Sequence, residues 1–247
     1  MFSNQMTAYI GAGGDLKTNT YKEFVANNPY VSPTLFITQT NKKYSFFGGF
    51  NGKLSPMVSY DIKASYSDED DKPMFVKNNS KSDGSTPGSL LGYEYGNSFA
   101  VIYDDIQTLS FNAEMRIDIS PNLMIGANSE FNSYTLTTQS EVLNLPTMRA
   151  EIFGNYTFDQ WYGSVNAFVV SSRNDLSYNA IYPAAINGVK TLKSYVDLNI
   201  NGGYHINKQF TAFLRLSNIL NSDYQQFSNF TVQGFQVLGG VSYKFDF

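Results

Sequence analysis

The chain has 247 residues, a formal net charge of −4 and no cysteine. This charge provides no basic surface for nucleic acid, and the lack of cysteine excludes a disulfide framework and a thiolate nucleophile. Aromatic residues make up 16% of the chain and charged residues only 15%, against the roughly 25% charged residues of an average soluble domain. Such a composition is typical of a surface that meets lipid between girdles of aromatic side chains.

Alternation of apolar and polar residues with a period of two predicts ten strands. In the clearest case, Leu109, Phe111 and Met115 alternate with Ser110 and Glu114. Successive side chains of a strand point to opposite faces, so one face is apolar and the other is polar. A helix would scatter these charges around all of its sides. In chain order, the expected strands cover residues 7–17, 44–52, 58–66, 99–119, 123–135, 148–158, 161–171, 196–204, 210–220 and 235–247.

The connections alternate between short turns and long polar loops. This alternation requires residues 99–119 to form one strand, with the turn-like residues 104–107 inside it. The pattern supports this, because Phe99 and Tyr103 lie on the same face of the strand as Leu109. Outer-membrane barrels have short periplasmic turns and long extracellular loops. No helix is expected. The short turns are 54–56, 120–122, 159–160 and 206–209, and the long loops are 18–42, 67–97, 136–146, 174–192 and 221–233.

The strands of a soluble β-sandwich also alternate between apolar and polar residues. The length of the expected strands distinguishes a membrane barrel from such a sandwich. These strands run about 10 to 13 residues, whereas soluble strands usually have about 5 to 6 and a tilted strand that crosses a bilayer needs about 9 to 11. We therefore predict an all-β fold, a transmembrane antiparallel up-and-down β-barrel in the bacterial outer membrane. Residues 1–247 are expected to form a single barrel segment whose inward faces line a wet lumen.

The end of the chain carries a narrower signal. The segment 213–224 contains the run from Asn218 to Asn221 followed by Tyr224, then Gly234 and a final strand that ends in Phe247. It resembles the penultimate and last strands of TonB-dependent outer-membrane receptors, in which an Asn-Leu-Phe-Asn motif is followed by a tyrosine. The resemblance covers about the last sixth of the chain. It implies energised import of a nutrient through a 22-stranded barrel with an N-terminal plug.

The chain departs from that family pattern in three respects. The Pro-Gly-Arg sequence that usually precedes the last strand is replaced by Val232-Gln233-Gly234. Ten strands are too few for such a barrel, and no plug domain or TonB-contacting segment can be located. The N-terminal residues 1–6 also lack the basic and apolar regions of a signal peptide. We expect the C-terminal portion of a receptor, whose partners are outer-membrane lipid, the barrel assembly machinery and the rest of the receptor or other outer-membrane subunits. The alternative is a self-contained small barrel with a structural, adhesion or accessory-subunit role.

No catalytic or cofactor-binding residue is expected, and the chain is interpreted as a non-enzyme. His205 is the single histidine; it follows the outward Tyr204 and is expected to point inward beside the periplasmic turn. No metal site is expected, although oxygen ligands of the kind that Ca²⁺ prefers occur in one acidic run that is interpreted as part of a solvated loop. That run consists of Asp68, Glu69, Asp70 and Asp71.

Two groups of aromatic residues are expected to contact the membrane or its machinery. Trp161 opens a strand directly after a short turn and is interpreted as an interface anchor, together with Tyr156, Phe158 and Tyr162. The resemblance to outer-membrane receptors implies that the last strand carries the signal recognised by the barrel assembly machinery. The residues of this signal are Tyr243, Phe245 and Phe247.

Overall fold

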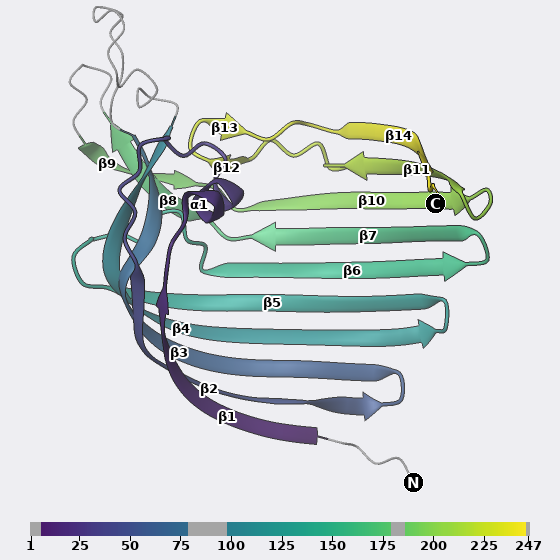
Figure 1. The fold of residues 1–247 in the computed structure, drawn as a ribbon, viewed down its shortest axis with the longest axis horizontal. Coiled ribbons are helices and arrows are strands. Elements are labelled where there is room, and N and C mark those ends of the chain that lie inside the picture. The colour runs from purple at the N-terminus through teal and green to yellow at the C-terminus, as the bar shows by residue number, and fades with distance from the viewer. Residues whose placement is uncertain (1–5, 79–97, 179–185, 246–247) are drawn as a thin grey trace, which may run out of the picture.

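The computed structural model describes residues 6–78, 98–178 and 186–245. Its main element is one antiparallel sheet of ten strands, which run up and down in chain order with the small hairpins β8–β9 and β12–β13 inserted (Figure 1). The predicted all-β, up-and-down fold with ten long strands is confirmed. The strands of the sheet are β1 (Met6–Lys17), β2 (Thr40–Ser55), β3 (Val58–Lys77), β4 (Phe99–Ser120), β5 (Leu123–Leu136), β6 (Met148–Phe158), β7 (Trp161–Val170), β10 (Tyr195–His205), β11 (Phe210–Ser217) and β14 (Gln236–Tyr243).

Both edges of this sheet are open in the described part of the chain. The first strand, β1, pairs only with β2, and the last strand, β14, pairs only with β11. Figure 1 shows these two strands on opposite sides of the sheet. Because a closed barrel has no edge strands, the sheet is a section of barrel wall and not a closed barrel.

The connections divide between the two ends of the sheet. At one end, which we call the short-turn end, strands are joined by tight turns; pairing continues to Phe158 and Trp161 on either side of Asp159. Asp159 has a φ of 52°, the left-handed conformation that two-residue hairpins favour. The described parts of the other connections lie at the opposite end, which we call the loop end (Figure 1). The predicted alternation is confirmed, and residues 104–107 lie within β4, which is a single strand of 22 residues.

The prediction that the chain contains no helix is wrong. A helix of seven residues, α1 (Tyr21–Asn27), lies in the first long loop. Its start is fixed by a capping box, in which the Thr20 hydroxyl accepts a hydrogen bond from the Glu23 amide and the Glu23 carboxylate accepts one from the Thr20 amide, both at 3.2 Å. Phe24 then anchors the helix because its side chain is buried. Within the described ranges, no helix has the length and apolar character needed to cross a membrane.

Three other expected loops also contain regular structure. The segment 174–192 contributes to a hairpin of β8 (Arg173–Tyr178) and β9 (Ile186–Leu192), and 221–233 contains a small hairpin of β12 (Gln225–Phe227) and β13 (Phe230–Thr231). Strand β3 continues ten residues beyond Ser67, so the loop expected at 67–97 starts later than predicted. These elements carry no strict alternation, because they pack against one another and not against lipid and water.

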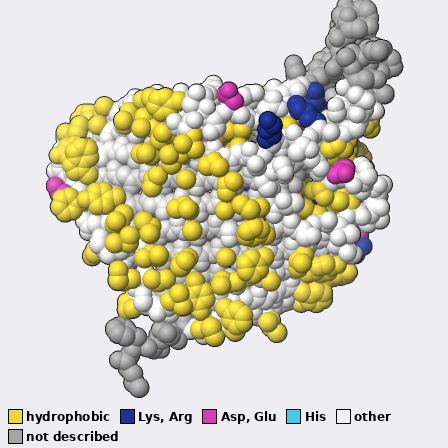
Figure 2. All heavy atoms as spheres, turned by 180° about the vertical axis from the view of Figure 1, so that it is seen from behind, with side chains coloured by type: hydrophobic (Ala, Val, Ile, Leu, Met, Phe, Trp, Pro, Cys, Tyr) yellow, Lys and Arg dark blue, Asp and Glu magenta, His cyan; other side chains and the backbone are white. Residues whose placement is uncertain are grey.

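The two faces of the sheet differ in the way the alternation predicts. On the outer face, Leu109, Phe111 and Met115 of β4 remain 57%, 46% and 43% exposed. Figure 2, which views the molecule from behind, shows hydrophobic side chains spread over this face from one edge of the sheet to the other. An apolar surface of this extent is not stable in water, and it matches the lipid-facing band of a membrane barrel.

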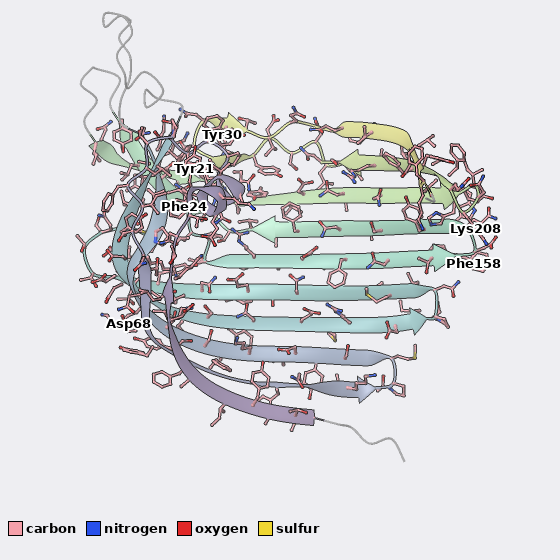
Figure 3. The ribbon with its side chains drawn as sticks, in the orientation of Figure 1. Tyr21, Phe24, Tyr30, Asp68, Phe158 and Lys208 are labelled. Carbon is pink, nitrogen blue, oxygen red and sulfur yellow. The ribbon has the colours of Figure 1, made fainter. Side chains whose placement is uncertain are left out.

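The packed core of the described residues lies at the loop end, where the loop-end parts of β3 and β4 contribute to it. One cluster joins side chains of α1, β4 and β12, and a second joins β3, β4 and the loop after β5. Phe24 and Tyr30, labelled in Figure 3, belong to the connection between β1 and β2 that enters this region. We call these two clusters the loop-end core; their buried members are Phe24, Val31, Phe99 and Phe227, and Met74, Val76, Ile106 and Leu143.

Candidate functional site: the polar wall and the loop end

The inner face of the sheet is a polar wall built from the residues between the outward apolar ones. In its centre, the Glu151 carboxylate accepts hydrogen bonds from the side-chain amides of Asn128, at 3.0 Å, and Asn166. Glu130 accepts a hydrogen bond from the Asn132 amide at 2.7 Å. Amides from the two neighbouring strands therefore hold the Glu151 carboxylate, and an amide from its own strand holds that of Glu130, while both remain accessible from the lumen side.

Cations and aromatic rings extend this wall toward β1. The Lys63 ammonium lies 4.8 Å from the centre of the Phe47 ring, a cation–π contact. The Tyr9 hydroxyl donates to the Asp61 carboxylate at 3.3 Å. The wall thus offers both signs of charge together with aromatic faces, which suits a water-filled lumen or contact with a polar domain inside the barrel.

Two hollows lie on this wall near the loop end. The first, of about 330 Å³, is lined by charged residues of β2 to β5, including Lys42, Glu69, Lys72 and Glu130. The second, of about 350 Å³, lies toward β10, and its lining is more aromatic. Both hollows are shallow recesses of an open wall. The second is lined by Arg149, Glu151, Phe168, Tyr195 and Tyr224 among others.

The acidic run of β3 does not form a common oxygen cage. Strand geometry sends Glu69 to one face, where it pairs with Lys72 at 2.7 Å. Asp68 and Asp70 both pair with Lys43 of β2, at 3.6 and 2.5 Å. Asp71 has a φ of 53° and lies in the bulge of β3, where its amide donates to Asp105. Over the described ranges, no three His, Cys, Asp or Glu side chains gather as metal ligands would.

The two asparagines of the motif that resembles the receptor family, Asn218 and Asn221, shape the chain at the end of β11. Asn218 and Asn221 adopt φ values of 47° and 48°, which asparagine tolerates better than most residues. The buried Asn218 amide donates to the carbonyls of Ser222, at 3.1 Å, and Gln233, at 3.0 Å. The Asn221 side chain accepts from the Phe235 amide at 3.0 Å. Together they turn the chain out of β11 and tie both ends of the connection to β14.

Tyr224 completes this arrangement by returning the chain to β10. Its ring stacks on Tyr195, with centroids 3.8 Å apart and planes inclined by 6°. Its hydroxyl donates to the buried Asp197 at 2.6 Å. Burial, with the hydrogen bond to Asp197 as a second cause, raises the pKa of Tyr224 well above its usual value. Tyr224 therefore stays protonated and keeps this hydrogen bond at physiological pH.

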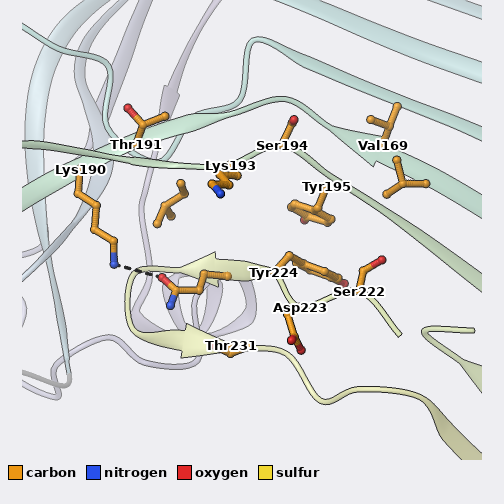
Figure 4. A pocket seen from close by; sticks show the side chains of 13 residues that line it. Val169, Lys190, Thr191, Lys193, Ser194, Tyr195, Ser222, Asp223, Tyr224 and Thr231 are labelled. Atoms are coloured by element: carbon orange, nitrogen blue, oxygen red, sulfur yellow. Dashed lines mark hydrogen bonds between the residues drawn. The ribbon is translucent and has the colours of Figure 1, made fainter. Parts of the chain in front are cut away.

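A third and larger hollow, of about 700 Å³, lies beside this tyrosine pair (Figure 4). We call it the lateral pocket. Lys190 crosses one side of it, donating to the Gln225 side chain and to the Ser228 hydroxyl, both at 3.3 Å. Its lining comes from the end of β9, the start of β10 and the segment 222–225 together with Thr231.

Aromatic side chains form a band on the outer face at the short-turn end. Trp161 contacts Tyr204 with ring centroids 4.7 Å apart, and Phe210 contacts Tyr243 at the same distance. Tyr156 and Phe158 are also exposed on this face, and Figure 3 shows Phe158 near Lys208 at this end. Three of the four predicted anchors, Trp161, Tyr156 and Phe158, therefore lie within one band.

Tyr162 and His205 lie on the opposite face. Tyr162 pairs in register with Gly203, and the His205 ring packs against it with centroids 5.1 Å apart. The His205 Nδ1 atom is 2.9 Å from the Thr211 hydroxyl. The structure thus places Tyr162 on the inner wall, apart from the band that holds the other three predicted anchors. His205 points inward as predicted.

The predicted assembly signal is only partly described. Tyr243 closes β14 and contacts Phe245 edge-on, with ring centroids 4.6 Å apart. Both rings are exposed to the outside. Phe247, the third residue of the signal, lies outside the described residues.

Sequence reasoning did not single out Arg173, Tyr195 or Asp197. Arg173 is buried, donates to the Gln225 carbonyl at 2.7 Å, and lies 5.2 Å from the Tyr195 ring. These contacts join three segments that are far apart in the sequence. No spacing or motif within one segment could have revealed them.

Comparisons with known proteins agree on the fold. No protein-family model matches the sequence, and no curated protein matches it. The pyoverdine receptor FpvA of Pseudomonas aeruginosa, solved with pyoverdine bound, is 11% identical with a TM-score of 0.64, and the match covers 97% of this chain and 34% of that chain. The copper transporter OprC is 13% identical with a TM-score of 0.64, and the match covers 99% of this chain and 38% of that chain. The ferric-catecholate import receptor Fiu of E. coli is 11% identical with a TM-score of 0.63, and the match covers 99% of this chain and 34% of that chain.

An up-and-down sheet with an apolar outer face, a polar inner wall and long connections at one end defines an outer-membrane β-barrel protein. Within that class, the chain has the fold of a section of the barrel of TonB-dependent receptors. It spans about a third of the length of the receptors that it matches. Those proteins are described as receptors and a transporter.

Proposed function

We propose that the chain is the C-terminal part of a TonB-dependent receptor that imports a nutrient across the outer membrane. The observation that carries this proposal is the open sheet, because β1 and β14 each lack a partner on one side among the described residues. A 22-stranded transporter barrel would supply about twelve more strands between these edges. Its plug would contact the polar wall, and its substrate would enter from the loop end.

Several finer roles belong to the same proposal. Tyr243 and Phe245, with Phe247 after them, act as the signal for the barrel assembly machinery. Trp161 and Phe158 anchor the wall at one membrane interface, where aromatic rings are favoured. The chain itself catalyses no reaction, and its working surfaces are the polar wall and the loop end.

The proposal is tested on the protein in its native outer membrane. An affinity tag in the exposed β10–β11 turn, near Lys208, allows isolation without denaturation, and mass spectrometry identifies every polypeptide present. We expect the remaining strands and a plug in the same polypeptide or in a tightly bound second one. We also expect nutrient uptake to be lost on deletion of the gene and to stop when a protonophore removes the energy source. A 247-residue chain that by itself forms a heat-modifiable monomer would contradict the proposal.

The alternative is a self-contained barrel with a structural, adhesion or accessory-subunit role. The observation that favours it is the loop-end core, which is assembled within this chain and presents a preformed surface. Exposed rings such as Tyr21 and Phe36 lie on that surface. Loss of partner binding in Tyr21→Ser and Phe36→Ser variants, with uptake unchanged, would support this role instead.

A further inference from the structure

The lateral pocket exists because β10 and β11 part toward the loop end. Strand β10 pairs with β7 from Tyr195 to Tyr204, but it pairs with β11 only from Ile200 onward. Beyond this point β11 ends at Ser217, and one further hydrogen bond, from the Ile219 amide to the Leu198 carbonyl at 2.9 Å, joins the chain to β10 before it turns away. The start of β10 therefore has a strand on one side and the lateral pocket on the other.

This pocket opens toward the membrane and is closed toward the lumen. Val169 and Val196 belong to the outward apolar row, and both line the pocket. The stacked rings of Tyr195 and Tyr224 form its inner side (Figure 4). The same two rings also line the 350 Å³ hollow on the polar wall. The stacked pair thus lies between the pocket and the hollow of the polar wall, and Val169 also lines both.

The pocket lies at the depth of the lipid headgroups. Strand β10 has 11 residues, which span about 35 Å along the strand at ~3.3 Å per residue. With a tilt of roughly 40°, this length crosses an apolar band of about 25 Å. The aromatic band around Tyr204 marks one interface, so the start of β10 and the pocket beside it lie at the other. Figure 2 shows Lys and Arg side chains on the outer face near the loop end.

The charges of the pocket favour an anion. Lys193 lines the pocket and forms no ion pair with a described residue, and the described acceptors of Lys190 are the uncharged Gln225 and Ser228. Asp223 also lines the pocket and offsets one of these two positive charges. Behind the tyrosine pair, the positive charge of the buried Arg173 is offset by the buried Asp197 carboxylate, so the net positive charge of the pocket comes from its two lysines. Hydroxyls of Ser194, Ser222 and Thr231 supply neutral donors.

We propose that the lateral pocket binds the phosphate headgroup of an anionic lipid. Lys193 and Lys190 contact the phosphate, and the acyl chains leave the pocket along Val169 and Val196 into the apolar outer face. Ammonium groups near a membrane surface favour anionic lipids, and an apolar lining that continues into the lipid-facing surface favours an amphiphile over a free ion. This site concerns the membrane and not the imported nutrient, so its failure would leave the proposed import function untouched.

Photo-crosslinking of the full-length protein that carries this chain tests the site. The protein is reconstituted in phosphatidylcholine vesicles with a minor fraction of a photoactivatable phosphatidic acid or, in parallel, of a photoactivatable phosphatidylcholine. Crosslinked peptides are identified by mass spectrometry. We expect phosphatidic acid to label residues 190–196 and 222–231 far more strongly than phosphatidylcholine does. Replacement of Lys193 by Gln should lower this labelling about fivefold, and the double variant Lys190→Gln with Lys193→Gln more than tenfold.

Two control variants separate the site from general charge effects. Lys208→Gln removes a lysine at the opposite interface and should leave the labelling of these segments unchanged. Lys193→Arg keeps the charge and should retain most of the labelling, and heat-modifiability shows that each variant is folded. Equal labelling by both lipids, or an equal loss in Lys208→Gln, would overturn the proposal. Complete competition by inorganic phosphate would also overturn it, because the ligand would then be the free ion.

Discussion

At the residue scale, aromatic rings of the inner wall cover glycines of the neighbouring strand. Tyr162 lies over Gly203, where any Cβ atom would overlap the ring, and Phe153 covers Gly126 in the same way. A glycine leaves a gap in the sheet surface, and a cross-strand ring fills it and fixes the register. This packing explains why Tyr162 points inward although its neighbour Trp161 lies in the lipid-facing band.

We predict that Gly203→Val destabilises the barrel by about 1–3 kcal/mol, because the new side chain forces the Tyr162 ring from its place. Urea titration of the reconstituted protein measures the loss. Gly202→Ala is the matched control, since a Cβ there meets only the Tyr162 carbonyl at an ordinary 3.5 Å. Adding Tyr162→Ala to Gly203→Val should recover part of the lost stability. A neutral Gly203→Val variant would show that the ring does not need this gap.

Asp175 of β8 gives the loop end a dependence on pH. Its side chain is fully buried and accepts hydrogen bonds from the amides of Lys77, at 3.2 Å, and Leu176, at 2.8 Å. Burial, although opposed by these hydrogen bonds, raises the pKa of Asp175 above its usual value. The neutral carboxyl is therefore the form that the folded state prefers. Its stabilising effect is fully present below about pH 4 and is lost as the pH rises through the raised folded-state pKa.

We predict that protection of the β8–β9 amides from hydrogen exchange falls as the pH rises above about 4 and through the raised pKa of Asp175. Asp175→Asn should remove this dependence, because the amide stays neutral at every pH. Protection factors corrected for the intrinsic exchange rate provide the measurement, with the exposed Asp223→Asn as the control. The same fall in Asp175→Asn as in the unmodified protein would assign the effect to another group.

At the scale of elements, the loop end is a small folded unit held by aromatic contacts between distant connections. Phe227 of β12 packs against Phe99 of β4 and Phe75 of β3, with ring centroids 5.3 and 6.1 Å apart. Phe24 of α1 joins the same cluster. The hairpin β12–β13 is thus attached to the start of the chain, although its own strand β11 lies on the far side of the sheet.

We predict that Phe227→Ala destabilises the loop end by about 3–5 kcal/mol, the cost of removing a buried aromatic ring. The sheet should persist because only the loop-end parts of β3 and β4 contact this cluster, and the backbone pairing of its strands does not involve Phe227. The expected result is faster proteolysis within residues 218–235 together with unchanged heat-modifiability. Phe36→Ala removes a ring that is 78% exposed and should leave the proteolysis rate as it was. Equal rates in Phe227→Ala and the unmodified protein would show that the cluster does not hold the hairpin.

Sequence periodicity predicted the elements of the wall well and those of the loop end poorly. Phe111 faces lipid on the outer face of β4, and the next residue, Asn112, faces water on the inner face. The two environments therefore impose the alternation of apolar and polar residues. The side chains of α1 and β12 meet other protein segments, and no fixed period follows from that. The capping residues Thr20 and Glu23 were the one local signal of the missed helix. The bulge at Asp71, which extends β3, has no comparable signal.

At the scale of the whole molecule, the alternation of connections correctly placed all long loops at one end, and the family resemblance correctly indicated the receptor barrel. The polar wall also follows from the inward row of each strand. The lateral pocket and the pair of Tyr195 and Tyr224 could not be predicted, because they arise where β10 and β11 part and a distant segment returns. Such contacts depend on the path of the chain in space.

The most direct test of the account asks what each side of the wall touches. Because the chain contains no cysteine, spin labels can be attached at single engineered cysteines along β4 in the folded, membrane-embedded protein. Labels replacing Leu109, Phe111 and Met115 should be accessible to oxygen dissolved in lipid, and labels replacing Asn112 and Glu114 to a water-soluble nickel chelate. A period of two in these accessibilities is the predicted result. Equal accessibility of the two rows, or an outer row shielded from oxygen by protein, would contradict it.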